Sequence, residues 1–412
     1  MLRKHVVIVG GGWAGIALAR KLKKIPKEKI RITLVSDQQN FRYSAALYRV
    51  ATGYREKEAI IPISELTEDI ESLKFVKAKT THINRSKKII TLEGGQELHY
   101  DIVVLALGNI TNYYDIPGLK ELCYGIKSPH ELHRFRAHLH HELIDENSPD
   151  KNYVIVGAGP TGIELSAALA SYLKRVARRH SLRKKSINIE LVEASHRVLP
   201  LSNASVSKKV LKRLHKLGIK VHLNSRVGSE TADSLQYNGK SIPTHTVVWT
   251  AGTSNNPFFK ANHTQFSLNK KGKVIVDDRM QVDRYTYVIG DNADTPYSGL
   301  GLTAVHNAKY VARDIAKRLE GQLRTPIYRP LVPASVVPVG KSWAIFQYRN
   351  IVISGIIGGI IRIVADLTAY HDIAGWYNGT KYWLRSGNKE ERCQVCKIAI
   401  KQEDWVTQSS YR

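Results

Sequence analysis

Cysteine is scarce in this chain, which has three cysteines among 412 residues. Three cysteines cannot form a disulfide framework for a chain this long, so we expect a reducing compartment. The chain also lacks a long apolar run. The longest one, residues 351–365, contains Arg362 and is shorter than the about 20 residues that a membrane-spanning helix needs. We therefore expect no segment that crosses a bilayer.

Acidic residues are few beside the basic ones. Lys and Arg number 62 against 36 Asp and Glu, so the formal net charge at pH 7 is +26. A surface this basic attracts anionic partners such as nucleic acid, anionic lipid or phosphorylated ligands. No helix-turn-helix or ribonucleoprotein motif accompanies the charge, so nucleic acid is not expected as a partner. Residues 1–4 lead directly into an apolar run, and no targeting segment is recognisable there.

Two stretches of the chain share one pattern: an apolar run, a glycine-rich turn and a segment with helical spacing. The first begins at residues 5–9 and is followed by a second strand at 30–35. The second begins at residue 153 and is followed by a strand at 187–193. Each stretch is a βαβ unit, and its turn matches G-x-G-x-x-G. The pattern predicts an α/β fold with two Rossmann-like dinucleotide-binding domains.

The fingerprint glycines are Gly10, Gly12 and Gly15 in the first unit and Gly157, Gly159 and Gly162 in the second. The first glycine of each set permits the tight turn, the second lets the backbone approach a pyrophosphate, and the third lets the helix pack on the strand. An acidic residue after the second strand is expected to hold the ribose hydroxyls.

Asp37 is the acidic candidate in the first unit, with a solvated turn aspartate as the alternative. Glu193 is the candidate in the second unit. Its carboxylate repels a 2′-phosphate, so NADH is favoured over NADPH, although Arg197 could soften that preference. Asp291 follows a further strand and precedes an apolar helix, where it can accept a hydrogen bond from a ribityl hydroxyl. The first unit is therefore predicted to bind FAD and the second NADH.

The order of these motifs (GGGWAG, LALG, GAGPTGIE, WTAG and GDNA) resembles that of flavoproteins with two dinucleotide-binding domains. The chain looks most like the type II NADH dehydrogenases, the single-subunit NADH:quinone oxidoreductases. Residues 41–53 resemble the segment that follows the family's second strand, and Glu164 stands where the family has a glutamate near the flavin–nicotinamide contact. The resemblance covers roughly residues 4–385.

The resemblance implies a discontinuous FAD domain with an NADH domain inserted into it. We expect the FAD domain at 1–115 and 253–345, the NADH domain at 116–252, and a C-terminal membrane-association or dimer segment with a tail at 346–412. FAD is expected to contact Gly10, Gly12, Trp13, Ala14, Gly15, Asp37, Thr52, Gly108, Gly290 and Asp291. NADH is expected to contact Gly157, Gly159, Gly162, Glu164, Glu193 and Gly252. In this reading, Glu164 orients the nicotinamide or relays a proton.

The chain departs from the family at the quinone pocket. The family's helix after the Gly-Asp element carries two glutamines, and Leu302 and His306 stand in their places. Leu302 cannot donate a hydrogen bond to a quinone carbonyl, whereas His306 can. His306 is therefore the candidate for quinone contact or protonation, and the identity of the quinone stays open.

Cysteine and histidine positions argue against other chemistry. Disulfide reductases and sulfide:quinone reductases need cysteine pairs facing the flavin, and residues 41–53 contain no cysteine. Cys123 is expected to be a packing residue. Cys393 and Cys396 form half of a zinc site, so no complete metal site is expected, with a metal shared between two chains as the alternative. The histidines are expected to lie on an exposed helical face: residues 130, 133, 138, 140 and 141.

We predict FAD-dependent oxidation of NADH with two-electron reduction of a membrane quinone, without proton pumping, in respiratory electron transfer at the cytoplasmic face of the cell membrane. Residues 351–385 combine apolar and aromatic residues with cations, which suits an anionic membrane surface. Packing in a homodimer interface is the alternative, and both can hold. One competing function is a soluble or peripheral NAD(P)H-dependent flavin reductase serving a protein or small-molecule acceptor. The other is a non-enzymatic binder that reports redox state.

Overall fold

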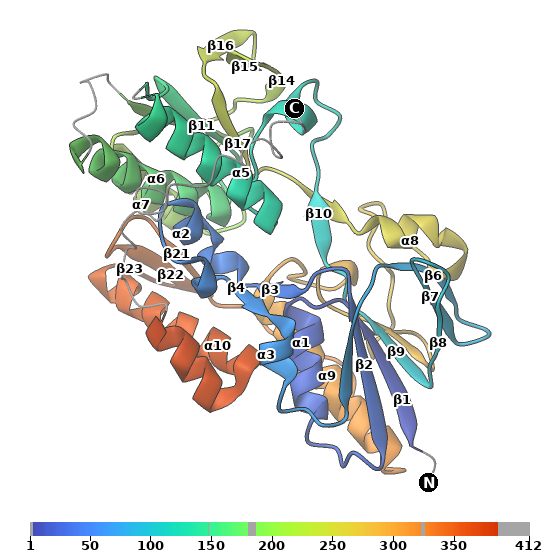
Figure 1. Cartoon of the computed structure of the whole chain (residues 1–412). Coiled ribbons are helices and arrows are strands. Elements are labelled where there is room, and N and C mark those ends of the chain that lie inside the picture. Colours follow the sequence, from blue (N-terminus) through green and yellow to red (C-terminus); the bar gives the residue numbers. More distant parts are fainter. Residues whose placement is uncertain (1–2, 147, 180–186, 323–325, 386–412) are drawn as a thin grey trace.

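One mainly parallel sheet and one parallel sheet form the framework of the chain, whose computed structural model describes residues 3–146, 148–179, 187–322 and 326–385 (Figure 1). The first sheet has six strands in the order β19-β20-β9-β1-β2-β5, and the second has four in the order β13-β12-β11-β17. Each contains one of the two fingerprint βαβ units. The predicted α/β class with two Rossmann-like domains is therefore confirmed, while the exact domain ranges stay predictions.

The first sheet is built around β1, which pairs in parallel with β2 and β9. Its strands are β1 (Lys4–Val9), β2 (Ile30–Ser36), β5 (Leu73–Lys77), β9 (Ile102–Leu105), β19 (Gln281–Asp283) and β20 (Thr286–Val288). β1 is buried from its second residue onward. This burial explains its continuous apolar run, because a parallel strand covered on both faces has no polar side. Helices α1 (Trp13–Leu22) and α9 (Gly301–Leu319) pack against each other beside the sheet.

Smaller elements complete the first lobe. They are β3 (Asn40–Arg42), η1 (Ser44–Ala46), α2 (Leu47–Ala51), η2 (Glu56–Glu58), β4 (Ile60–Pro62), α3 (Ile63–Thr67), β6 (Thr80–Asn84), β7 (Ile89–Leu92), β8 (Glu97–His99), α8 (Pro257–Ala261), η4 (His263–Gln265) and η5 (Gly290–Asn292). Strands β6, β7 and β8 form a three-stranded antiparallel sheet, and β3 pairs with β4.

The second sheet carries the inserted lobe. Its strands are β11 (Asn152–Val156), β12 (Asn188–Val192), β13 (Ile219–His222) and β17 (Thr246–Trp249). The helices and further strands of this lobe are α4 (Leu119–Leu122), α5 (Pro129–His140), the π-helix η3 (His141–Asp145), α6 (Pro160–Arg179), α7 (Ala204–Lys216), β14 (Val227–Thr231), β15 (Ser234–Tyr237) and β16 (Lys240–Pro243). α5 begins with a capping box between Ser128 and Glu131.

The chain passes between the two lobes twice, and the two passages pair with each other. β10 (Asn109–Thr111) leaves the first lobe, and β18 (Thr253–Asn255) returns to it. The two strands form an antiparallel pair in which Asn109 lies opposite Asn255 (Figure 1). This connection brings the ends of the two parallel sheets towards one another.

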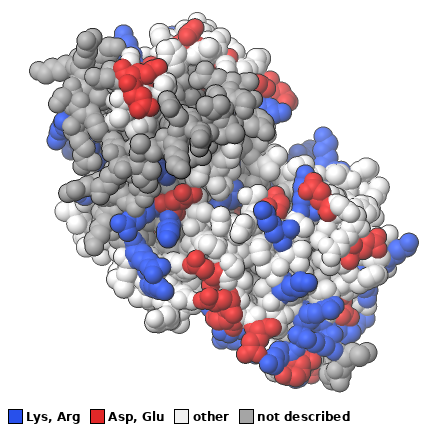
Figure 2. Space-filling view, viewed as in Figure 1, with Lys and Arg blue, Asp and Glu red and all other residues white. Residues whose placement is uncertain are grey.

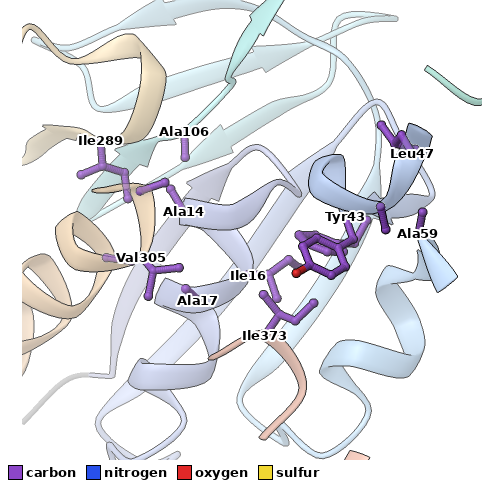
Figure 3. Close-up of a cluster of buried hydrophobic side chains, with 14 of the residues drawn as sticks. Ala14, Ile16, Ala17, Tyr43, Leu47, Ala59, Ala106, Ile289, Val305 and Ile373 are labelled. Atoms are coloured by element: carbon purple, nitrogen blue, oxygen red, sulfur yellow. The ribbon is translucent and has the colours of Figure 1, made fainter. Parts of the chain in front are cut away.

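The C-terminal part packs on the first lobe. It consists of β21 (Ser335–Pro338), β22 (Ala344–Tyr348), β23 (Ile351–Gly355) and α10 (Ile356–Arg385). Gly375 interrupts α10 with φ +74° and ψ 179°, a conformation that strains residues with side chains. The break divides α10 into two helical halves, both of which follow β23. Figure 3 shows Ile373 of α10 close to Ile16 of α1 and to Tyr43.

None of the helices in the described part of the chain combines the length and the apolar character that a bilayer crossing demands.

Candidate active site

Both fingerprint turns have the geometry that a pyrophosphate requires. Gly10 and Gly157 have φ values of +117° and +102°. A Cβ atom on Gly15 would lie 1.9 Å from the Gly10 carbonyl oxygen, and one on Gly162 would lie 1.8 Å from the Gly157 carbonyl oxygen. These positions therefore exclude side chains because strand and helix approach so closely.

The middle glycines behave differently. A Cβ atom on Gly12 or Gly159 would meet no atom within 4 Å. The backbone at both positions thus borders open space at the start of a helix, where free N–H groups favour an anion. The cradle needed for a dinucleotide phosphate is present in both lobes.

Several predicted FAD residues gather around the first cradle. The Trp13 indole N–H is buried and has no hydrogen-bond partner among the described residues, so a ligand atom could satisfy it. Ala14 packs near Gly290, which has φ +68°. The Asp291 carboxylate accepts a hydrogen bond from Asn109 Nδ2 at 2.6 Å, and burial raises its pKa.

Asn292 links the carboxyl ends of two neighbouring strands in this region. Its side chain accepts a hydrogen bond from the Gly108 N–H at 2.9 Å and donates one to the Gly108 carbonyl at 2.7 Å. Asn307 accepts a hydrogen bond from the Gly290 N–H at 3.0 Å. Both asparagines are fully buried. They hold Gly108 and Gly290 in place, and the sequence reading had not singled them out.

Asp37 and Thr52 differ in their surroundings. Asp37 directly follows β2 and is exposed, while the preceding Ser36 is buried and accepts a hydrogen bond from the Gln38 N–H. Thr52 is buried, and its hydroxyl lies 3.0 Å from the Tyr48 carbonyl oxygen. The FAD roles of Asp37 and Thr52 stay predictions.

Glu193 lies directly against the second fingerprint turn. Its carboxylate accepts hydrogen bonds from the Ala158 N–H at 2.6 Å and from the Ser195 N–H at 2.7 Å. The carboxylate is therefore held at the end of β12, beside the loop that would bind the pyrophosphate. Gly252 ends the β17 segment and approaches the Asn112 carbonyl so closely that a Cβ atom would lie 2.5 Å from it. Arg197 donates to the Pro200 carbonyl.

Glu164 lies in the wall of a cavity of about 220 Å³ where α2 of the first lobe, the second lobe and the C-terminal part meet. The cavity is lined by α2, α6, the β21–β22 turn and the first half of α10: Tyr48, Arg49, Thr52, Tyr54, Glu164, Ala168, Ser171, Arg175, Pro338, Gly340, Lys341, Ser342, Trp343, Ala344, Ile356, Gly359, Ile360, Arg362, Ile363 and Asp366. Burial raises the pKa of Glu164 to about 8, although Arg362 and Arg49 act in the opposite direction. Glu164 can therefore hold a proton at neutral pH.

A buried charge cluster stands beside this carboxyl group. Asp366 accepts hydrogen bonds from Tyr43 Oη and from the Arg362 guanidinium, and Arg49 Nη1 lies 3.4 Å from its Oδ2. Arg362 also donates to the Ala45 carbonyl at 2.8 Å. From the sequence, Arg362 was named only as a charge within an apolar run, without a role, and Asp366 was not used. An arginine and an aspartate four residues apart in an apolar helix were the available signal.

The predicted quinone residues lie outside the lining of this cavity. His306 Nε2 is 3.0 Å from the Arg329 carbonyl oxygen, and its ring contacts Tyr328. Leu302 is 42% exposed near the start of α9. Their quinone roles stay predictions, and the cavity offers Glu164 and its neighbours instead.

The expectation of an exposed histidine face is wrong for two of the five histidines. His140 is buried. His138 stacks on Tyr124 and its Nε2 lies 2.8 Å from Thr246 Oγ1, which joins α5 to the second sheet. The helix covers part of the sheet, and these two histidines lie on its inward face.

One group of potential metal ligands occurs near this helix: Glu142, Asp150 and His245. Hydrogen bonds already engage both carboxylates, since Tyr153 donates to Glu142 and the His245 N–H donates to Asp150. Cys123 is buried in the apolar core of the second lobe, as predicted for a packing residue. Cys393 and Cys396 lie outside the described residues.

Comparison with known proteins places these features in a family. The family model described as pyridine nucleotide-disulphide oxidoreductase matches residues 4–311. The chain belongs to this oxidoreductase family. Its matched region contains both fingerprints, Glu164, Glu193 and Asp291.

Proteins similar to this chain carry names that match the motifs. A probable NADH dehydrogenase of Dictyostelium discoideum is 26% identical over 93% of this chain and 89% of its own length. A type II NADH:quinone oxidoreductase of Mycobacterium tuberculosis is 26% identical over 89% of this chain and 84% of its own length. The resemblance to type II NADH dehydrogenases drawn from the motifs is thereby confirmed.

Solved structures share the fold of this pyridine nucleotide-disulphide oxidoreductase. NDH2 from Plasmodium falciparum in complex with NADH superimposes with a TM-score of 0.83 at 16% identity, covering 94% of this chain and 99% of the other. The sulfide:quinone oxidoreductase of Aquifex aeolicus gives a TM-score of 0.76 at 19% identity, covering 90% and 92%. Both likenesses extend into the C-terminal part, beyond the residues that the family model matches.

We expect Glu193→Ala to reduce the preference for NADH over NADPH by about fivefold, because the variant removes like-charge repulsion on the order of 1 kcal/mol towards a 2′-phosphate. Dissociation constants for both nucleotides would measure it. Glu193→Gln is the matched control, since it keeps a hydrogen-bond acceptor for the fingerprint turn and removes only the charge. If the ratio of the two dissociation constants stays unchanged in both variants, Glu193 does not select between NADH and NADPH.

Proposed function

We propose that this chain oxidises NADH with bound FAD and reduces a quinone that enters from a membrane surface. One observation carries the quinone half of the proposal. Glu164, a buried acid whose pKa burial raises to about 8, faces a cavity whose wall includes Ile356, Ile360 and Ile363. These three isoleucines are also exposed on the outer surface of α10. The cavity therefore borders an apolar outer face, where a lipid-soluble molecule would approach.

The two glycine cradles support the nucleotide half. Gly12 opens the first cradle and Gly159 the second, and the Trp13 N–H and Asp291 carboxylate lie on the first. When bound, FAD would supply a hydride acceptor that passes two electrons onward. The residues of this chain would hold the two nucleotides in register and keep water away from their contact.

Quinone reduction consumes two protons as well as two electrons, so the site must deliver protons to the acceptor. Glu164 is placed for this task because burial keeps its carboxyl group protonated below about pH 8. Arg362 and Arg49 lower the pKa of Glu164 and would stabilise its carboxylate after the proton leaves. The cluster around Asp366 would keep both arginines in position.

The proposed location is the cytoplasmic face of an anionic membrane, and the outer face of α10 supports the peripheral membrane contact. Its exposed apolar side chains are Ile356, Ile357, Ile360, Ile363, Val364, Trp376, Tyr377 and Leu384. In Figure 2, the lower-left margin where α10 lies shows mainly uncharged and basic side chains. Such a surface suits the boundary between lipid headgroups and acyl chains.

Two of the aromatic residues expected to face lipid turn back to the protein instead. Tyr382 donates a hydrogen bond to Glu65 at 2.8 Å, and the Trp383 N–H donates to the Ile363 carbonyl at 3.1 Å. Trp376 and Tyr377 remain as the exposed aromatic pair after the Gly375 break. A homodimer through this segment stays a prediction. The alternative of a flavin reductase with another acceptor is not favoured by the names of the relatives.

The proposed function predicts two separable half-reactions. Under anaerobic conditions, NADH should bleach the flavin absorbance of the purified protein, and a soluble quinone analogue should restore it. Bleaching without recovery would reject the quinone half and support the flavin reductase. A protein that binds no flavin after FAD is supplied would reject the function as a whole.

Glu164→Gln should slow reoxidation by quinone and spare reduction by NADH, because the amide cannot donate a carboxyl proton. In the unaltered protein, the reoxidation rate should fall as pH rises through about 8, where Glu164 loses its proton. Stopped-flow absorbance would measure both steps. If the variant keeps the same pH-dependent fall, another group supplies the proton.

Replacing Ile357 and Trp376 together by glutamate should weaken binding to liposomes that contain anionic lipid by at least about tenfold, since burial of each large apolar side chain contributes roughly 1.5–3 kcal/mol. Neither side chain lines the cavity. Glutamate at Ile275 and Ile327 is the matched control, because these isoleucines are similarly exposed elsewhere. Co-sedimentation would measure liposome binding. An equal loss of binding in both double variants would show that α10 is not the specific membrane contact.

A further inference from the structure

The backbone of Lys127 is clamped between the two lobes. Its N–H donates to Glu131 Oε2 at 2.7 Å, within the network that caps α5. Its carbonyl accepts a hydrogen bond from Arg42 Nη1 at 2.9 Å, and Arg42 ends β3 of the first lobe. Gly125, two residues earlier, packs so closely on the Glu131 carboxylate that a Cβ atom would lie 2.7 Å from its Cδ. The side chain of Lys127 therefore starts from a fixed point.

The Lys127 ammonium is partly buried without a strong partner. Its only hydrogen bond recorded within the described residues is a long one, 3.4 Å to the Gly252 carbonyl oxygen, and it makes no ion pair within 4 Å there. Burial lowers its pKa, while the negative charges of Glu131 and Asp291 raise it. This ammonium has lost part of its hydration, and the protein replaces that hydration with only one long hydrogen bond. Binding an anionic ligand would therefore stabilise it.

The position of this ammonium limits what the ligand can be. Gly252 follows β17 at the carboxyl end of the second sheet, and Asp291 follows β20 at the carboxyl end of the first. Ligands of open α/β sheets bind in the crevice at these ends. Lys127 therefore reaches the junction of the two nucleotide crevices, where a flavin ring and a nicotinamide ring would meet.

We propose that Lys127 stabilises the negative charge that the bound flavin gains when it accepts a hydride, an inference that rests on the proposed function. Hydride transfer from NADH releases NAD⁺ and adds two electrons and one proton to the flavin, so the flavin gains one negative charge. A fixed cation nearby favours the reduced form and raises the midpoint potential. NADH then becomes the better electron donor.

A nucleotide phosphate is the competing ligand for this cation. Each pyrophosphate already has its own cradle, at Gly12 in the first lobe and at Gly159 in the second. Two of the three charged neighbours of this cation, Asp291 and Arg42, come from the first lobe, which is the flavin side. The third, Glu131, comes from α5 of the second lobe, where backbone N–H groups already engage its carboxylate. The flavin ring is therefore the ligand that the surroundings of Lys127 favour.

The test compares Lys127→Met with Lys127→Arg in the FAD-loaded protein, with no NADH or quinone present. Anaerobic spectroelectrochemistry would give the two-electron midpoint potential, and titration with FAD would give the affinity of the oxidised form. We expect Lys127→Met to favour oxidised over reduced flavin by about tenfold, which lowers the potential by about 30 mV. Lys127→Arg should keep the potential, and the affinity for oxidised FAD should change little.

Lys273→Met is the matched control. Lys273 also acts on Asp291, but it lies in the first-lobe loop between η4 and β19, whereas Lys127 lies in the second lobe. Its potential should stay near that of the unaltered protein. An equal fall in both methionine variants would show a diffuse effect of net charge and overturn the proposal. So would an unchanged potential in Lys127→Met with weaker NADH binding, which would make Lys127 a phosphate contact.

These outcomes separate the inference from the proposed function. If the unaltered protein completes both half-reactions while Lys127→Met keeps its potential, only the role of Lys127 is lost. If the unaltered protein binds no FAD, both are lost. Should Lys127→Met fail to retain FAD, Lys127→Gln is the second variant, because it keeps a hydrogen-bond donor for the Gly252 carbonyl and removes the charge.

Discussion

One buried carboxylate, Asp366, holds the proposed quinone side of the protein together. It accepts hydrogen bonds from Tyr43 and Arg362, and Arg49 completes its surroundings. Removing one partner from a buried ion pair of this kind costs about 3–5 kcal/mol, because the remaining charge stays desolvated and unpaired. The first half of α10 depends on this contact for its place against the first lobe. The cavity beside Glu164 in turn depends on α10 for one of its walls.

In the proposed function, electrons would pass from the second cradle to the first cradle and then to the cavity beside Glu164. The second cradle lies beside Glu193, and the first lies beside Trp13 and Asp291. The paired strands β10 and β18 hold the two lobes so that these crevices face the same junction. Glu164 stands near the start of α6, so the helix that opens the second cradle, proposed for NADH, also carries the acid of the cavity. In the proposed function, nucleotide binding and proton supply would therefore share one rigid element.

Local patterns in the sequence predicted the fold and the glycine cradles, because tight turns and strand–helix contacts are written in neighbouring residues. The charge cluster could not be found that way. Tyr43 and Asp366 are 323 positions apart, and only the tertiary packing of α10 brings them together. The same reason explains why the burial of His140 was not predicted. It also explains why Lys127 was not recognised, because its surroundings include Gly252 and Asp291 from other segments.

Three isoleucines belong both to the cavity wall and to the outer face of α10. They determine which concentration of the proposed quinone the protein responds to. A molecule that arrives through lipid is presented at its mole fraction in the bilayer and not at its concentration in the buffer. Adding plain lipid to a fixed amount of quinone would dilute the substrate even though the volume stays constant. For a cavity that opens towards lipid, the apparent affinity for the quinone depends on the membrane composition as much as on the protein.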